Sequence, residues 1–498
     1  MNKISLLFFI FLSLNCFTQQ NNTLFLLHDL PQSNLMNPAT PLTCKWYVGI
    51  PVLSSIHFNY ANSSFSYNQI FTPTNTSYEP NVTGLIKRLH SRNSISTELH
   101  LQLFALAYRK EENSFYFTIT EKNNFLFTYP KKTILLLLDG NAQFVGEKVG
   151  ITGSGISFNH YREYALGWSH ELNKKTTFGV KGKLLFGKLN ISTKTLDFNI
   201  DSDETTYNLD FTGELNLRMS LPVTVDILDN RFNGISYNDA MSPVQLALNR
   251  KNPGFAIDLG VIHKYSRKVE LSASIIDLGF IRWKSNLSNL NASGEFFFDG
   301  FLDASSDSFF KNLGDTIINA LNLTNNQDKY VTFLSPKLMA GANYKINERF
   351  SSGAIAQTSI HRRKIMTSLT LMGQFNPKPW FGLAASYSFQ NYSLNNLGAG
   401  IYIGKRGAQF YVVSDNLLFI PKPLDTRNVN LRLGVNILFG CEKKVKGSKE
   451  NKSNEFTCFG ISDSERKKYR ENFVPWEQRK KKTKKRKSIL QLFHLFQR

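Results

Sequence analysis

The stretch Val429-Asn430-Leu431-Arg432-Leu433-Gly434-Val435-Asn436-Ile437-Leu438-Phe439 decides the fold. Its odd-numbered residues are all apolar, and Asn430, Arg432, Gly434 and Asn436 alternate with them. A period of two is that of a β-strand with one face in an apolar medium. Strands of soluble proteins usually have about five or six residues, whereas a tilted strand that crosses a membrane needs about 9 to 11. The stretch therefore predicts a membrane-crossing strand in which Asn430, Arg432 and Asn436 face a lumen.

The same alternation recurs along the chain, in residues 255–261, 269–275, 338–346, 365–375 and 381–390. Short polar turns separate some of these segments, as at Ser266-Arg267-Lys268. In hydrocarbon an unpaired backbone N–H or C=O costs several kcal/mol, so strands that cross a membrane close into a barrel. The candidate segments predict an all-β fold, one closed antiparallel transmembrane β-barrel of roughly 14 strands over residues 45–440.

An apolar run from Ile4 to Leu14 follows Lys3 at the N-terminus. At about 11 residues the run is too short to cross a bilayer, which takes roughly 20, but it is typical of a secretory signal peptide. We interpret residues 1–18 as a cleaved leader and residues 19–44 as a periplasmic segment. Lipidation of Cys16 is the alternative to simple cleavage.

Beyond this run, no apolar stretch of the sequence is long enough to predict a transmembrane helix. A membrane location must therefore come from the strands. The alternative reading of the alternation is a large soluble β-sandwich or propeller. Strand length, an aromatic content of 13% and the export signal favour the outer membrane instead.

Two segments interrupt the strand pattern. Residues 305–323 have apolar side chains at helical spacing and predict a short amphipathic helix, which would be a loop helix over one barrel mouth, a plug in the lumen or a helix at the membrane interface. The residues that carry this prediction are Phe309, Phe310, Leu313, Ile317 and Leu321. Residues 221–252 contain Pro222 and Pro243 and predict a long loop.

Residues 441–498 differ in composition from the rest. They hold 18 Lys and Arg against 7 Asp and Glu, a net charge of +11 in a chain whose total is +21. Such runs usually form disordered, solvated tails, and we predict a basic periplasmic tail here. The alternative is docking of the tail on an anionic membrane surface or an acidic envelope protein. Nucleic acid is not expected as a partner of an exported chain.

No residue pattern indicates catalysis, a metal or a cofactor. Removal of the leader leaves Cys44, Cys441 and Cys458, an odd number that argues against a disulfide framework, although Cys441 and Cys458 could pair across a short loop. Zinc-ligand spacings, a GxSxG elbow and a Walker loop are all missing from the sequence. Ser157 with His160 and Ser169 with His170 are the candidates for a hydrolase pair, and each more simply faces the lumen or a turn. We predict that the chain is not an enzyme.

Three motifs resemble an uncharacterised Bacteroidetes family of predicted outer-membrane barrels that carries a domain-of-unknown-function label. The motifs are Pro31-Gln32-Ser33-Asn34-Leu35-Met36-Asn37-Pro38-Ala39, Tyr161-Arg162-Glu163-Tyr164-Ala165-Leu166-Gly167 and Asp277-Leu278-Gly279-Phe280-Ile281-Arg282-Trp283-Lys284-Ser285-Asn286. The resemblance covers about residues 25 to 440 and implies a barrel similar in style to the PorV and long-chain fatty-acid transporter group. It implies no agreed activity and no catalytic residues.

Three functions remain open from the sequence. The first is passive transport of small or hydrophobic molecules. The second is a non-enzymatic accessory or scaffold barrel of an envelope machinery such as protein secretion or gliding, with a protein partner bound through the basic tail. The third is a membrane-embedded hydrolase. Outer-membrane lipid is the expected surrounding in every case.

Overall fold

The computed structural model describes residues 22–441, apart from residues 75–76, 140–141, 151, 206–208, 229–230, 238–241, 299–321, 362–363 and 390–395. The predicted leader, the predicted tail beyond Cys441 and the five residues of the predicted amphipathic helix, Phe309, Phe310, Leu313, Ile317 and Leu321, lie outside the described residues. That helix was predicted to end at Leu323, but Leu323 belongs to a strand, β16 (Asn322–Asn326).

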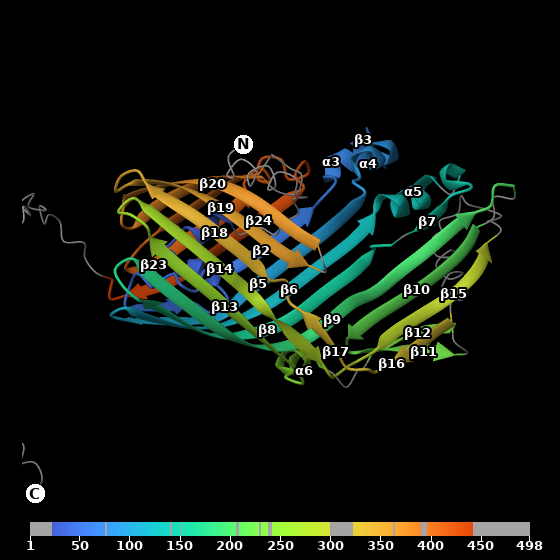
Figure 1. Ribbon diagram of the computed structural model, residues 1–498, viewed down its shortest axis with the longest axis horizontal. Coiled ribbons are helices and arrows are strands. Elements are labelled where there is room, and N and C mark those ends of the chain that lie inside the picture. The colour runs from blue at the N-terminus through green and yellow to red at the C-terminus, as the bar shows by residue number, and fades with distance from the viewer. Residues whose placement is uncertain are drawn as a thin grey trace, which may run out of the picture. The chain divides into compact units, whose positions relative to one another are not determined.

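Fourteen antiparallel strands close into one barrel, as the sequence predicts (Figure 1). β1 (Trp46–Gly49) and β2 (Ile56–Asn62) together form the first barrel strand, because both pair with β24 (Asn428–Phe439) on one side and with β5 (Arg92–Lys110) on the other. The other barrel strands follow in chain order: β6 (Asn113–Pro130), β8 (Gly155–Glu171), β9 (Thr176–Ser202), β13 (Asn252–Lys264), β14 (Val269–Trp283), β17 (Tyr330–Phe333) with β18 (Lys337–Lys345), β19 (Phe350–His361), β20 (Lys364–Lys378), β21 (Phe381–Phe389), β22 (Leu397–Ile403) and β23 (Gly407–Asn416).

The outward face of the barrel is apolar. Leu166, Leu184 and Leu371 are 68%, 57% and 52% exposed, and monomeric soluble proteins rarely expose apolar surface on this scale. Aromatic rings lie near one rim of the barrel, where the centroids of Trp46 and Tyr108 are 4.3 Å apart. An apolar band with aromatic residues at its edge is the surface of a barrel embedded in the outer membrane. Among the described residues, no helix is long and apolar enough to cross a membrane.

The two ends of the barrel differ. At the end that holds Trp46 and Phe439, strands are joined by short turns, such as residues 111–112 and 265–268. The other end carries longer connections with their own elements: α3 (Tyr67–Ile70), β3 (Phe71–Pro73), β4 (Tyr78–Pro80), α4 (Val82–Arg88), α5 (Lys131–Asp139), a 3-10 helix (Ala142–Phe144) and β7 (Lys148–Gly150). In outer-membrane barrels the short turns lie on the periplasmic side.

The wall forks along β9, which has 27 residues. The first half of β9 pairs with β13, and the second half pairs with β10 (Leu209–Ser220). From β10 the sheet continues to β15 (Asn289–Phe298) and then to β16, and Figure 1 shows β10 and β15 alongside the second half of β9. The fork therefore adds sheet beyond the membrane-spanning ring.

The prediction of a long loop over residues 221–252 was wrong. This segment contains the hairpin β11 (Val223–Leu228) and β12 (Arg231–Tyr237) and the helix α6 (Pro243–Leu248). Pro243 does not interrupt structure, because it occupies the first turn of α6 behind the N-cap Ser242, where the missing N–H has no helical partner to lose.

A disulfide joins Cys44 to Cys441, which are 397 residues apart in sequence. Cys44 lies just before β1 and Cys441 just after β24, and closure of the barrel makes these strands neighbours. Because Cys441 is bonded to Cys44, the alternative pairing with Cys458 is excluded. Counting cysteines failed here, since the closing seam of a barrel brings together residues from its two chain ends.

Candidate functional site in the plugged lumen

Residues 22–44 lie inside the barrel, and we call them the plug. They contain the helix α2 (Asn22–Phe25) and a 3-10 helix, η1 (Pro31–Leu35), and Leu24, Phe25 and Leu30 are at most 1% exposed. The sequence predicted a separate periplasmic segment over residues 19–44, and the structure corrects this for the described part. The prediction failed because the described apolar partners of this segment, such as Met339 and Met372, belong to strands far away in the sequence and meet the segment on the inner face of the closed barrel.

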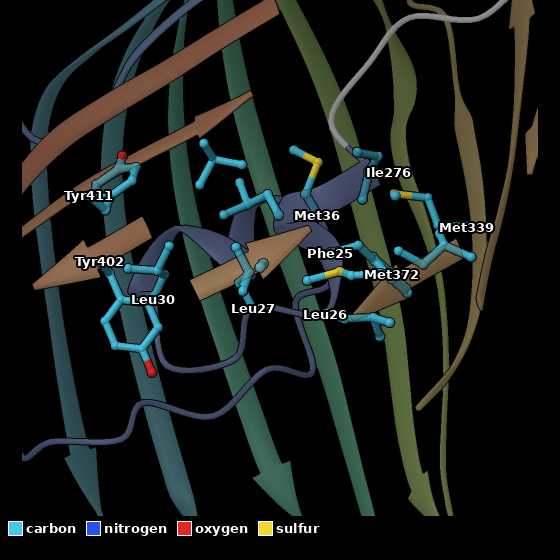
Figure 2. Packing of buried hydrophobic residues seen from close by; sticks show 14 residues of the cluster. Phe25, Leu26, Leu27, Leu30, Met36, Ile276, Met339, Met372, Tyr402 and Tyr411 are labelled. Carbon is cyan, nitrogen blue, oxygen red and sulfur yellow. The ribbon is translucent and has the colours of Figure 1, made fainter. Parts of the chain in front are cut away.

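The plug packs on an apolar part of the lumen, which we call the apolar wall and define as Met339, Ile355, Met372, Ala384 and Val413. These residues come from β18, β19, β20, β21 and β23, and Figure 2 shows Phe25, Leu26, Leu27 and Leu30 of the plug among neighbouring side chains. Burial of one such side chain is worth about 1.5 to 3 kcal/mol. Inward glycines make room for the plug, because a Cβ at Gly341 or Gly353 would meet Phe25 or Leu26.

Polar side chains of the wall also hold the plug. The carboxylate of Asp415 accepts hydrogen bonds from the backbone N–H groups of Asn22 (3.1 Å) and Thr23 (2.8 Å) at the start of α2. Gln32 donates to Asn436, and Asn436 donates back to Gln32 over 3.0 Å. Each bond satisfies a buried donor or acceptor that would otherwise be costly.

The motif Asn37-Pro38-Ala39 fits against two strands of the opposite wall. A Cβ at Gly179 of β9 would collide with the backbone of Pro38 and Ala39, and a Cβ at Gly260 of β13 would collide with Asn37. Nearby, Nζ of Lys181 donates to the backbone carbonyl of Asn34 over 2.8 Å. This side of the lumen therefore holds the plug by close backbone contact and directed hydrogen bonds.

Five charged residues form an ionic cluster in the lumen: Lys122, Glu163, Lys183, Asp258 and Asp277. Lys122 lies 2.8 Å from Glu163, and Lys183 lies 2.7 Å from Asp258 and 2.6 Å from Asp277. The side chains of these residues are at most 16% exposed. Buried charges of this kind persist only when they are paired, and removing one partner leaves the other uncompensated.

A β-bulge directs Asp277 into this cluster. Asp277 has φ +59°, a left-handed conformation that Asp adopts more readily than most residues, and the register between β13 and β14 shifts opposite it. Its backbone N–H donates to Asp258 over 2.8 Å. As a result the consecutive residues Ile276 and Asp277 both line the lumen, which a regular strand does not allow.

A mouth of about 450 Å³ lies beside the plug at the short-turn end of the barrel. It is lined by His28 and Asp29 of the plug and by basic residues of the turns, among them Arg267, Lys268 and Arg349. The plug is held here by the pair of His28 with Glu270 (3.2 Å) and by the hydrogen bond from Tyr402 to Asp29 (2.8 Å).

Three potential metal ligands meet in the lumen: His57, Glu98 and His100, whose ligand atoms lie within 4.8 Å of one another. Sequence reasoning missed this group, since His57 is on β2 and the others are on β5, and the register opposes His57 to His100. Two imidazoles and a carboxylate are a common donor set for transition metals. However, Nζ of Lys337 lies 3.7 Å from Glu98, and this cation opposes a second positive charge.

The three residues predicted to face the lumen are all buried there, with Asn430 2%, Arg432 3% and Asn436 0% exposed. Asn436 binds the plug, Arg432 donates to Ser55 over 2.8 Å, and Asn430 donates to Asn59 over 3.3 Å.

The two candidate Ser-His pairs have other partners. His160 is bonded to Glu121 over 2.6 Å, and His170 is bonded to Asn113 over 3.0 Å. Neither arrangement supplies a base to a serine nucleophile, which needs the two side chains within hydrogen-bond reach.

The three motifs that carry the family resemblance meet at this site. The first supplies Asn34 and residues 37–39 of the plug, and the second and third supply Glu163 and Asp277 of the ionic cluster. The three motifs, which are far apart in the sequence, thus supply both the plug and the charged residues of the wall beside it.

A family model described as "Family of unknown function (DUF5723)" matches residues 38–415. The chain is similar to the toluene transporter TbuX of Ralstonia pickettii, at 9% identity and a TM-score of 0.41, over 82% of this chain and 94% of that one. It is also similar to the toluene transporter TodX of Pseudomonas putida, at 9% identity and a TM-score of 0.38, over 85% and 98% of the chains.

A FadL homologue of Pseudomonas aeruginosa is similar over 86% of this chain and 100% of that one, at 10% identity and a TM-score of 0.33. The first two proteins are described as transporters. No curated protein matches the chain by sequence.

Proposed function

The chain therefore belongs to this family of unknown function, and we propose that it carries small hydrophobic molecules passively across the outer membrane through a barrel that its own plug closes. The observation that carries the proposal is the apolar wall. Barrels that pass water and ions have polar interiors, whereas Met339, Ile355 and Met372 point into this lumen and are covered by the plug. Displacement of the plug would uncover an apolar track for an apolar solute.

The attachment of the plug is compatible with such a displacement. Between Asn22 and Thr43 its described contacts with the wall are apolar packing, hydrogen bonds and one ion pair, and Cys44 alone is covalently bound. A plug held covalently only at one end, by the disulfide of Cys44 and by the backbone that continues into β1, can leave the lumen and return. A barrel of 14 strands is wide enough to leave a passage, since barrels of about eight strands are already filled by their own side chains.

The test is uptake of a radiolabelled small hydrocarbon by cells that carry the protein in their outer membrane. Met339→Gln and Met372→Gln place polar groups on the apolar wall, and we expect uptake to fall about tenfold, because each buried CH₂ group of an apolar solute contributes roughly 0.8 kcal/mol. Ile262→Gln is the matched control, an inward apolar residue of β13 outside the apolar wall. Uptake equal to that of cells without the protein would contradict the proposal.

We further propose that the chain has no catalytic activity, which the partners of His160 and His170 support. An origin in Bacteroidetes, a similarity to the PorV group and a cleaved leader are predictions from the sequence motifs and stay part of the proposal.

A second function, binding of an envelope protein through the basic tail, is supported by the net charge of +11 in residues 441–498. Deletion of residues 443–498 keeps the disulfide and removes most of that charge. We expect a co-purifying acidic protein to be lost on this deletion, and recovery of the same partner from the shortened chain would exclude the tail as its binding site.

A further inference from the structure

A largely enclosed cavity of about 40 Å³ lies between the plug and the ionic cluster. Leu35 and Met36 of the plug form one side of it. The charged residues that line it are five cations and three carboxylates, an excess of two positive charges: Lys122, Lys181, Lys183, Lys337, Arg432, Glu163, Asp258 and Asp277. Glu98, 3.7 Å from Lys337, reduces the excess to one.

The partners of the cations show where the excess lies. Lys122 and Lys183 are paired with carboxylates at 2.8 Å or less, whereas Lys181 is bound by the backbone carbonyl of Asn34. Lys337 has Glu98 only at 3.7 Å, which is long for a direct hydrogen bond. A buried positive charge that is not balanced is strongly unfavourable, so an anion in this cavity would be stabilised.

A second, independent feature is the hydroxyl of Thr120. Thr120 lines the same cavity, is 6% exposed, and its Oγ1 has no hydrogen-bond partner among the described residues. A hydroxyl is a hydrogen-bond donor, and buried polar groups are nearly always bonded. The cavity thus combines an excess of positive charge with an unused donor.

We propose that this cavity binds one small monovalent anion, chloride in the simplest case. One negative charge balances the count of the lining residues together with Glu98. A single water needs about 10 to 15 Å³ of such space, so the cavity holds an ion of chloride or formate size but not an extended organic anion. Because Leu35 and Met36 close the cavity, the bound anion links the plug to the charged wall. The proposal does not depend on transport.

The neighbouring group of His57, Glu98 and His100 does not make this a divalent metal site. A metal ion there would add two positive charges beside Lys337, and Arg432 and Lys122 line the adjoining cavity. At an effective dielectric constant of about 20, two like unit charges about 4 Å apart repel each other by several times the thermal energy. The same surroundings attract an anion.

The experiment is thermal unfolding of the purified full-length protein at constant ionic strength, with sodium gluconate replaced stepwise by sodium chloride or sodium formate. Gluconate is too large for the cavity. We expect the unfolding temperature to rise and saturate with chloride, as for a ligand that binds only the folded state. Chloride and formate distinguish a halide from a carboxylate occupant, and a response to either supports the proposal.

Variants locate the ion. Thr120→Val keeps every charge and nearly the same shape, and we expect about tenfold weaker chloride affinity from the loss of a charge-assisted hydrogen bond. Lys337→Met should abolish the response. Lys188→Met is the matched control, a buried lysine that donates to the Asn249 carbonyl and does not line the cavity, and it should leave the affinity unchanged.

Three results would overturn the proposal. One is an unfolding temperature that does not depend on which anion is present. Another is an unchanged affinity in Thr120→Val, a variant that tests the site even if Lys337→Met does not fold. The third is stabilisation by zinc chloride, relative to sodium chloride of equal chloride concentration, that is lost in His100→Ala, which would make the site a metal site.

Discussion

The lumen has two halves that bind the same plug in different ways. On β18–β23 the plug packs mainly on methionine, isoleucine, alanine and valine side chains, with hydrogen bonds to Asp415 and Tyr402 besides, and on β5–β14 it meets lysines, carboxylates and glycine backbone. Apolar packing has no preferred direction and tolerates sliding, whereas hydrogen bonds weaken steeply when they are misaligned. Under the proposed transport, the apolar half would set which molecules can replace the plug, and the directed bonds of the charged half would set the position to which the plug returns.

The largest effect is expected from removing the plug, which both halves of the lumen bind. Deletion of residues 22–40 leaves Cys44 and the barrel strands, and we expect single-channel conductance in planar bilayers to rise about tenfold or more, because a barrel of 14 strands is not filled by its own side chains. Deletion of residues 443–498 is the control and should leave the channel closed. A plugless barrel that stays silent would mean that the plug is not the barrier.

The charged half should be sensitive to loss of a single charge. Glu163→Gln leaves Lys122 without its partner at 2.8 Å and weakens the surroundings of Lys183, which lies 3.6 Å away. We expect a loss of about 3 kcal/mol in the free energy of unfolding, measured by denaturant titration in detergent micelles. The double variant Glu163→Gln with Lys122→Met should recover part of this loss. If it loses as much as the two single variants together, the two residues are not coupled.

More of the fold than of the candidate site in the lumen could be predicted from the sequence. The alternation around Leu431 and Val435 predicts strands, their length predicts a membrane, and hydrocarbon requires closure, so the barrel follows from local pattern and one solvent argument. The same alternation identified Asn430, Arg432 and Asn436 as candidates for the lumen. It cannot say what fills that lumen, because packing of Phe25 against Met372 joins segments with no local relation.

The charged site was missed for a similar reason. Lys122, Glu163, Lys183 and Asp258 stand among other inward polar residues on the neighbouring strands β6, β8, β9 and β13, and only the register between these strands brings the four together. Asp277 enters the cluster through a bulge, which breaks the alternation that sequence reasoning relies on. The resemblance to a family did mark two of these residues, Glu163 and Asp277, without assigning them a role.

The apolar half should lose less from a comparable change. Met372→Ala removes a buried side chain from the apolar wall, and we expect a loss of about 2 kcal/mol, at the low end for such truncations, because flexible neighbours such as Met339 can partly fill the space. Hydrogen exchange of residues 22–30 should become faster. If Met372→Ala lost more free energy of unfolding than Glu163→Gln, the apolar half and not the charged half would be the more sensitive to a single substitution.

The smallest effect is expected for an ion pair of nearly the same length outside the lumen. Arg109 and Glu171 lie 2.7 Å apart near the short turns, with side chains 32% and 28% exposed. In Glu171→Gln, Arg109 keeps its bonds to the carbonyls of Leu42 (2.8 Å) and Glu111 (3.1 Å). Water screens the remaining charge, so we expect a loss of about 0.5 kcal/mol in the same denaturant titration. A loss as large as that of Glu163→Gln would show that pairing itself, and not its burial in the charged half, determines the cost.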